Sequence, residues 1–185
     1  MLMPLMPCDL LPFCDPNPWR YSIAKPFVQG GWWCATDGRI LVCTPAYGHP
    51  ESVPSTDHNG NPGKFPNCKE LLGLIDKVEV WHEELPSLPT CPHCKGTGKK
   101  NQPCECSECD NKHVSEHDCD CHVEIGNCYL ATKYLLKVLT LPGVKWGVVD
   151  PASEKGIIFL RFDGGGMGGV MPLDKKKTDE EKWHK

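Results

Sequence analysis

The chain has 185 residues, enough for one domain with a hydrophobic core and an insertion. Its formal net charge of −4 at pH 7 argues against avid, non-specific binding of nucleic acid by the whole chain. No apolar run approaches the length of a membrane span. Residues 1–20 are apolar, but prolines interrupt them and a basic start is missing, so they are expected to form an irregular arm and not a secretory signal.

The 13 cysteines are an odd number, and seven of them lie between Cys91 and Cys121. This clustering, together with the missing signal, indicates a reducing cytoplasm and metal thiolates in preference to disulfides. The other cysteines are expected to be small buried apolar residues. They are Cys8, Cys14, Cys34, Cys43, Cys68 and Cys128.

The first predicted element is a β-hairpin. Residues 32–36 and 39–44 are rich in strand-forming side chains, and Asp37-Gly38 between them predicts a two-residue turn. Trp33 and Ala35 should share one face with Ile40 and Val42, and Trp32 and Cys34 should share the other with Leu41 and Cys43. Both faces are apolar, so both are expected to be covered.

A loop over residues 45–66 and a short helix follow the hairpin. Asn67 is the predicted N-cap of this helix, and residues 71–75 supply its apolar stripe. Residues 78–82 alternate in polarity and predict a strand that leads into the cysteine-rich stretch.

After the cysteines, residues 123–126 predict a strand, and Asn127 is the predicted cap of a helix over residues 128–141. Three closing strands are expected at residues 146–149, 156–162 and 169–171. The glycine-rich run between the last two predicts a flexible hairpin turn and lacks the Lys-Ser/Thr of a phosphate loop.

This order predicts an α+β domain, an antiparallel sheet with two helices on one face. The domain is expected to consist of residues 21–87 and 122–173. Residues 88–121 form an inserted module, and residues 174–185 form a charged, solvated tail.

The stretch WCATDGRIL, from Trp33 to Leu41, resembles the ATDGHRL hairpin of the bacterial DNA polymerase sliding clamp, the beta subunit. Residues 129–173 are similar to the closing helix, strands and MPM-type ending of that clamp, and the two matches have the family's order. The resemblance implies a clamp-like α+β domain. The chain departs from the family because it has room for one such domain where the bacterial subunit has three, because the module interrupts it, and because a tail follows Met171-Pro172-Leu173. An encircling clamp therefore does not follow.

The module has a resemblance of its own. CPHCKGTG, from Cys91 to Gly98, resembles the C-x-x-C-x-G-x-G repeat in the zinc domain of J-domain co-chaperones. The similarity covers one repeat and no J domain is present, so it implies zinc-knuckle geometry and not a chaperone function.

Cysteine spacing predicts structural zinc in the module, which has hardly any aliphatic residues to form a core. Cys91 and Cys94 open the module, and Cys119 and Cys121 close it, so these four thiolates predict an outer site. The candidates for an inner site are Cys106, Cys109, either His113 or His117, and also Cys104. Two zinc ions are favoured over one. The excess of thiolates argues against the open coordination position of a catalytic zinc.

Other chemistry has weaker signals. No Ser-His-Asp or Cys-His nucleophile is identifiable. His82-Glu83-Glu84 and His49/Glu51 are candidate acid–base pairs, and solvated loop residues are the favoured interpretation of both. Lys133 and Lys137 lie one turn apart on the second predicted helix. In sliding clamps such helices line the DNA hole, so both lysines are candidate DNA contacts, with an ordinary exposed face as the alternative.

The clamp resemblance also implies assembly through edge strands. Because both faces of the hairpin are apolar, a homo-oligomer is favoured. A two-fold dimer is the commonest closed assembly, and it would have Trp32 and Leu41 at the contact. The alternative is that the N-terminal arm folds over this face.

The sequence thus predicts a cytoplasmic, non-enzymatic binding protein with structural zinc. One hypothesis is a DNA-replication-associated accessory protein encoded by a phage or mobile element, with DNA or a replication protein as partner. The other is a protein-interaction adaptor whose zinc module is the binding surface. Neither involves a membrane or a small-molecule substrate.

Overall fold

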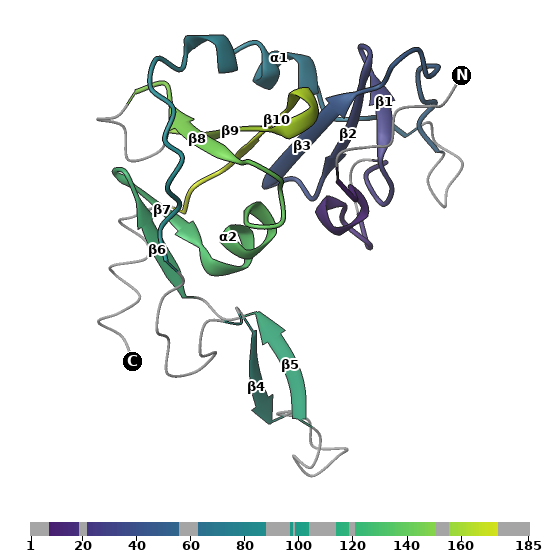
Figure 1. Ribbon diagram of the computed structural model, residues 1–185. Helices are drawn as coiled ribbons and strands as arrows, with labels where there is room; N and C mark the ends of the chain where they lie inside the picture. Colours follow the sequence, from purple (N-terminus) through teal and green to yellow (C-terminus); the bar gives the residue numbers. More distant parts are fainter. Residues whose placement is uncertain are drawn as a thin grey trace.

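The computed structural model describes residues 8–18, 22–55, 63–87, 97, 99–103, 114–118, 121–150 and 156–173. Its main body is a six-stranded antiparallel sheet in the order β1-β2-β3-β10-β9-β8 (Figure 1). The strands are β1 (Phe27–Gln29), β2 (Trp32–Thr36), β3 (Ile40–Pro45), β8 (Lys145–Val148), β9 (Ile158–Phe162) and β10 (Gly166–Val170). Two three-stranded meanders therefore lie side by side, and the pairing of β3 with β10 joins them.

Two short helices and two separate hairpins complete the domain, which confirms the predicted α+β class. The helices are α1 (Cys68–Leu72) and α2 (Thr132–Val138), and the 3-10 turns are η1 (Leu11–Phe13), η2 (Ile75–Lys77) and η3 (Asp163–Gly165). The hairpins are β4 (Lys99–Pro103) with β5 (Val114–Asp118), and β6 (His122–Ile125) with β7 (Cys128–Ala131). Over the described residues, no helix has both the length and the apolar character that crossing a membrane requires.

The hairpin of β2 and β3 forms where predicted, but its turn is longer. Thr36 is paired with Leu41 and Cys34 with Cys43, so four residues and not two connect the paired positions. This register differs from the predicted one by two residues, which leaves every side chain on its predicted face because side chains alternate with period 2. The assignment of the two faces is therefore confirmed.

The strand β1 was not predicted, and it pairs with β2 through a tight turn. Gln29 lies opposite Trp32, and the two residues between them, Gly30 and Gly31, both have positive φ (60° and 79°). Consecutive glycines suit a two-residue hairpin turn of this kind, so the Gly-Gly pair ahead of the aromatic strand was a usable signal.

The two helices lie on opposite faces of the sheet, so the prediction that they share one face is wrong (Figure 1). Successive residues of β9 show the division. Ile158 and Leu160 pack in the cluster with Leu135 of α2, whereas Phe159 packs with Leu71 and Leu72 beside α1. Because alternate strand residues face opposite sides, each helix must bury its apolar stripe against a different face.

Leu41, expected at a subunit contact, belongs to the core. It is 8% exposed and packs with Phe27 and Cys68 on the face that α1 covers. A charge at this position would destabilise the fold, so the prediction that Leu41 lies at a subunit contact is wrong. The N-terminal arm covers the other face, where Leu10 and Phe13 are buried in the cluster that contains α2. Self-association itself stays a prediction.

Residues 128–131 form a strand and not the start of the second helix. The pair Gly126-Asn127 is the turn of the β6–β7 hairpin, in which Ile125 is paired with Cys128, and Gly126 has a φ of 57°. Buried and partly buried residues alternate along β7, which is the pattern of a strand with one face on the core. Leu130, which fits the helical stripe of α2, fits this alternation equally well, and the glycine turn decides the outcome.

Residues 78–82 do not form the predicted strand. Only His82 makes a bridge, and its partner is Trp146 of β8. The return strand β6 pairs with β7 instead, so the two segments that flank the module are not neighbours in one sheet.

The glycine-rich run is mostly a central strand. The turn takes up only Asp163–Gly165, and β10 begins at Gly166. A Cβ at Gly168 would lie 2.1 Å from the carbonyl oxygen of Leu41, and one at Gly169 would lie 3.3 Å from Leu71 of α1. These glycines let β3 and α1 approach β10 closely, so the run is a packing requirement and not a flexible loop.

Candidate functional site

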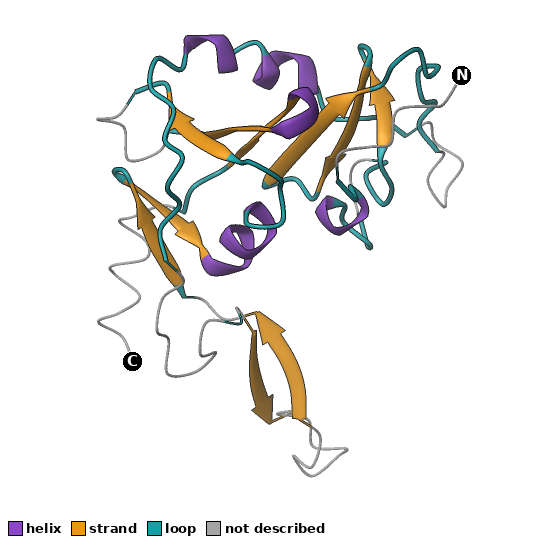
Figure 2. Cartoon of the chain, in the orientation of Figure 1, coloured by secondary structure: helices purple, strands orange, loops and turns teal. Residues whose placement is uncertain are grey.

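The described part of the cysteine module is a polar two-stranded ribbon. Lys99 is paired with Asp118 at one end, and Pro103 is paired with Val114 at the other. Figure 2 shows this ribbon standing apart from the six-stranded sheet, beyond α2. The strand sequences KKNQP and VSEHD hold one aliphatic residue between them. An isolated hairpin is at best marginally stable in water, so this ribbon needs another source of order.

Most of the predicted zinc ligands lie outside the described residues. They are Cys91, Cys94, Cys104, Cys106, Cys109, His113 and Cys119. His117 is in β5, opposite Lys100, and Cys121 directly precedes β6. Within the part of the chain that the structure describes, no three His, Cys, Asp or Glu side chains are arranged so that they could hold a metal ion.

Cys121 connects the module to the folded domain. Its carbonyl oxygen accepts a hydrogen bond of 3.0 Å from the backbone N–H of Thr132, the first residue of α2. The next residue, His122, has its ring 4.5 Å from the ring of Tyr129, and its Nδ1 atom is buried without a hydrogen-bond partner. A predicted metal ligand is thus anchored at the end of a helix.

Trp146 anchors the segment that leads into the module. Its backbone exchanges two hydrogen bonds with His82, of 2.8 and 2.9 Å, and the two rings are stacked 4.4 Å apart. The indole N–H donates to the carbonyl oxygen of Glu84, and the ring lies within reach of Gly126 in the β6–β7 turn. The Trp146 side chain therefore lies beside both the segment before the module, at His82 and Glu84, and the β6–β7 turn after it, at Gly126.

The two candidate acid–base pairs have structural contacts. Glu83 forms an ion pair with Lys145, whose ammonium lowers the pKa of the Glu83 carboxyl. Glu51 accepts hydrogen bonds from the backbone N–H groups of Gly30 and Gly31. These contacts account for both carboxylates without a catalytic role.

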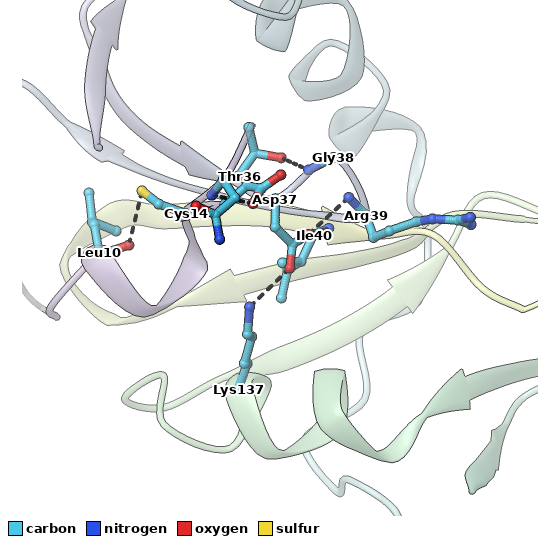
Figure 3. Close-up of polar contacts among 10 residues, drawn as sticks. Leu10, Cys14, Thr36, Asp37, Gly38, Arg39, Ile40 and Lys137 are labelled. Carbon is cyan, nitrogen blue, oxygen red and sulfur yellow. Dashed lines mark hydrogen bonds and ion pairs between the residues drawn. The ribbon is translucent and has the colours of Figure 1, made fainter. Parts of the chain in front are cut away.

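The candidate DNA contacts, Lys133 and Lys137, both lie on α2. The Lys137 ammonium lies 2.9 Å from the Asp37 carboxylate, and these side chains are 28% and 16% exposed (Figure 3). Both ammonium groups also lie near the ring of Tyr134, at 5.3 Å for Lys133 and 5.7 Å for Lys137. Lys137 is therefore used to attach α2 to the β2–β3 turn, which reduces its availability for a phosphate.

Asp37 organises that turn from within. Its Oδ1 atom accepts the backbone N–H groups of Arg39 and Ile40 at 3.0 and 3.1 Å, and Thr36 Oγ1 accepts the N–H of Gly38 (Figure 3). The Oδ2 atom faces Lys137. Asp37 thus holds the turn and α2 together, and Arg39 is left exposed.

Replacing Asp37 with alanine is expected to lower the free energy of unfolding by about 2 kcal/mol, because two backbone N–H groups and one ammonium lose a charged acceptor. Lys137→Met removes only a partly exposed ion pair and should cost at most about 1 kcal/mol. Urea denaturation of both variants measures the difference. Equal losses would contradict the assignment of the turn hydrogen bonds to Asp37.

Three buried thiols form a group that the sequence analysis did not assemble. Cys34 and Cys43 are opposite one another on β2 and β3 with their Sγ atoms 3.2 Å apart, and Cys68 of α1 packs in the same cluster. The hydrogen bond to Cys43 raises the pKa of Cys34, and the hydrogen bond to Cys34 and burial raise the pKa of Cys68. Cys34 and Cys68 are therefore protonated at neutral pH, and all three buried thiols pack as small apolar residues. The expectation of burial is confirmed for all of the outlying cysteines except Cys8, which is partly exposed.

Cys14 is a further buried thiol, and it lies near the Asp37 turn (Figure 3). Burial raises the pKa of Cys14 to about 11, so its thiol is protonated at neutral pH. Since the thiolate is the reactive form, Cys14 is not a candidate nucleophile.

Comparison of the chain with protein-family models, with curated proteins and with solved structures found no match.

Proposed function

We propose that this chain is a non-enzymatic, cytoplasmic adaptor that displays a zinc-organised module as its binding surface. The observation that carries the proposal is the β4–β5 ribbon, whose polar strands are paired away from the main sheet (Figure 2). The module has hardly any aliphatic residues to form a core, so bonds between its side chains and zinc are the remaining way to order it. Thiolates and imidazoles in excess suit a closed, structural zinc site.

The register of the ribbon supports the division into an outer and an inner site. Pro103 and Val114 are partners, and in the sequence Cys104 follows the first and His113 precedes the second. Lys99 and Asp118 are partners at the opposite end, and Cys119 follows Asp118. Cys91, Cys94, Cys119 and Cys121 are therefore proposed to bind one zinc ion at the base of the ribbon, and the remaining candidates a second at its tip.

The same register favours His113 over His117 at the inner site. His117 lies three residues along β5 from the Pro103–Val114 pair, which at the rise of a strand is roughly 10 Å away. Zinc–nitrogen bonds are only about 2 Å long, so a ligand of the tip site must come from the sequence next to Cys104–Cys109. His113 meets that requirement.

A replication-associated function is the second candidate. It rests on the resemblance of the β2–β3 hairpin to the sliding clamp and on the exposed Arg39 at that turn. The opposite placement of α1 and α2 and the pairing of Lys137 with Asp37 do not favour DNA contact by α2. An origin in a phage or mobile element belongs with this second proposal.

Cross-linking of the zinc-loaded full chain in a lysate of its source cells separates the two functions. For an adaptor, amine cross-links to a partner protein should map to the module lysines, such as Lys99 and Lys100, and they should disappear in Cys91→Ser. Binding of duplex DNA should be weak, because the chain has a net charge of −4.

The opposite result identifies the replication-associated function. Binding of duplex DNA that weakens steeply with salt, together with partner cross-links confined to the six-stranded sheet, would contradict the adaptor. The matched control is Lys145→Ala, which removes a lysine paired with Glu83 outside the module.

A further inference from the structure

The two edge strands of the six-stranded sheet are each bonded to a segment of the same chain. On β1, the backbone N–H of Val28 donates to Ser52 Oγ at 2.8 Å, and the Val28 carbonyl accepts the N–H of Ser52 at 3.0 Å. On β8, Trp146 exchanges two backbone hydrogen bonds with His82. Each edge strand is thus occupied at one residue whose backbone groups point outward, Val28 on β1 and Trp146 on β8.

The closure of β1 covers every donor on its outer side. Val28 is the residue of this strand that faces away from β2, and alternation places Pro26 and Gly30 on the same side. Pro26 has no N–H group, Ser52 accepts the N–H of Val28, and Glu51 accepts the N–H of Gly30 at 3.1 Å. Two consecutive side chains therefore close the edge.

The closure of β8 uses the segment that leads into the module. A Cβ at Gly147 would lie 2.4 Å from a methyl group of Val78 and 2.6 Å from the carbonyl oxygen of Val80. Residues 78–82 therefore lie directly against β8. This segment has strand-like sequence and yet makes a single bridge, which is enough to occupy the outward groups of Trp146.

We infer that Glu51 and Ser52 form an autoinhibitory edge cap, which prevents β1 from pairing with β1 of a second copy of this chain. An unprotected edge strand is a template for association, and proteins commonly cover such edges. A second copy is the occupant that fits, because two antiparallel β1 strands related by a two-fold axis at Val28 would exchange the same N–H and carbonyl groups that Ser52 now satisfies.

The test is amide hydrogen exchange and light scattering on the full-length chain and on the double variant Glu51→Ala/Ser52→Ala. In the parent, exchange at Val28 should be slow and independent of protein concentration. In the double variant at micromolar concentration, Val28 should exchange at least tenfold faster, and Trp146 should be unchanged. At higher concentration the variant should reach twice the molar mass of the parent, with renewed protection at Val28.

Ser55→Ala is the matched control, because Ser55 bonds Ser22 away from the edge and its loss should leave Val28 slow. Three results would each overturn the inference. They are unchanged exchange at Val28 in the double variant, a molar mass that follows the parent at every concentration, or a parent whose Val28 protection rises as its own mass doubles.

Discussion

Removal of metal from the purified chain is expected to disorder residues 91–121 and to leave the six-stranded sheet folded. The purified protein should contain one to two equivalents of zinc, because the polar β4–β5 ribbon has no other adequate source of order. Each structural site contributes on the order of 10 kcal/mol of binding free energy. Hydrogen exchange with and without a chelator measures the effect, with the amides of β3 and β10 as the internal reference.

Ligand variants sharpen this prediction. His113→Ala should lower the zinc content by up to one equivalent, whereas His117→Ala should leave it unchanged, because β5 places His117 away from the proposed tip site. A metal-free chain whose module amides are as protected as before would contradict the zinc proposal. Loss of zinc in His117→Ala alone would instead contradict the proposed register of the inner site.

Gly168→Ala is expected to lower the free energy of unfolding by more than about 3 kcal/mol. The added methyl would lie 2.1 Å from the carbonyl oxygen of Leu41, and that oxygen belongs to a strand backbone that cannot move without breaking the sheet. The β3–β10 pairing joins the two meanders, so the loss should be global. Urea denaturation followed by tryptophan fluorescence measures it.

Gly73→Ala is the matched control. Gly73 has helical geometry at the end of α1, and its nearest atoms would be 3.4 and 3.5 Å from the new methyl. The change should be within about 1 kcal/mol, since alanine at a helix-compatible position restricts the unfolded chain. If Gly168→Ala were as mild as this control, the close approach of β3 and β10 would be wrong.

The fold class and most strands could be predicted because their signals are local. The aromatic and β-branched residues of β2 and β3 identify those strands, and two-residue periodicity is robust even when the turn length is wrong. The boundary between β7 and α2 was harder. Leu130 satisfies both the strand and the helix pattern, and only the Gly126-Asn127 turn separates them.

The arrangement of the helices depends on contacts that no local pattern contains. The apolar stripe of α1 indicates burial, but not the face of the sheet on which it packs. On the face that α1 covers, Gly169 leaves room for Leu71, which would lie 3.3 Å from an added Cβ. At the proposed zinc sites the situation is reversed. Cysteine spacing predicts the ligands and their division into two sites, whereas the β4–β5 register is needed to favour His113 over His117 at the inner site.

The pairing of β3 with β10 has a consequence for how the chain is made. These strands lie at the centre of the sheet, and they join residues 40–43 to residues 167–170, near opposite ends of the described chain. Contacts between such distant residues form slowly, because the long intervening chain must first be closed into a loop. During synthesis, one side of β3 therefore stays without its partner until residue 170 has left the ribosome. The first meander must wait for the last strand of the sheet before its core is complete.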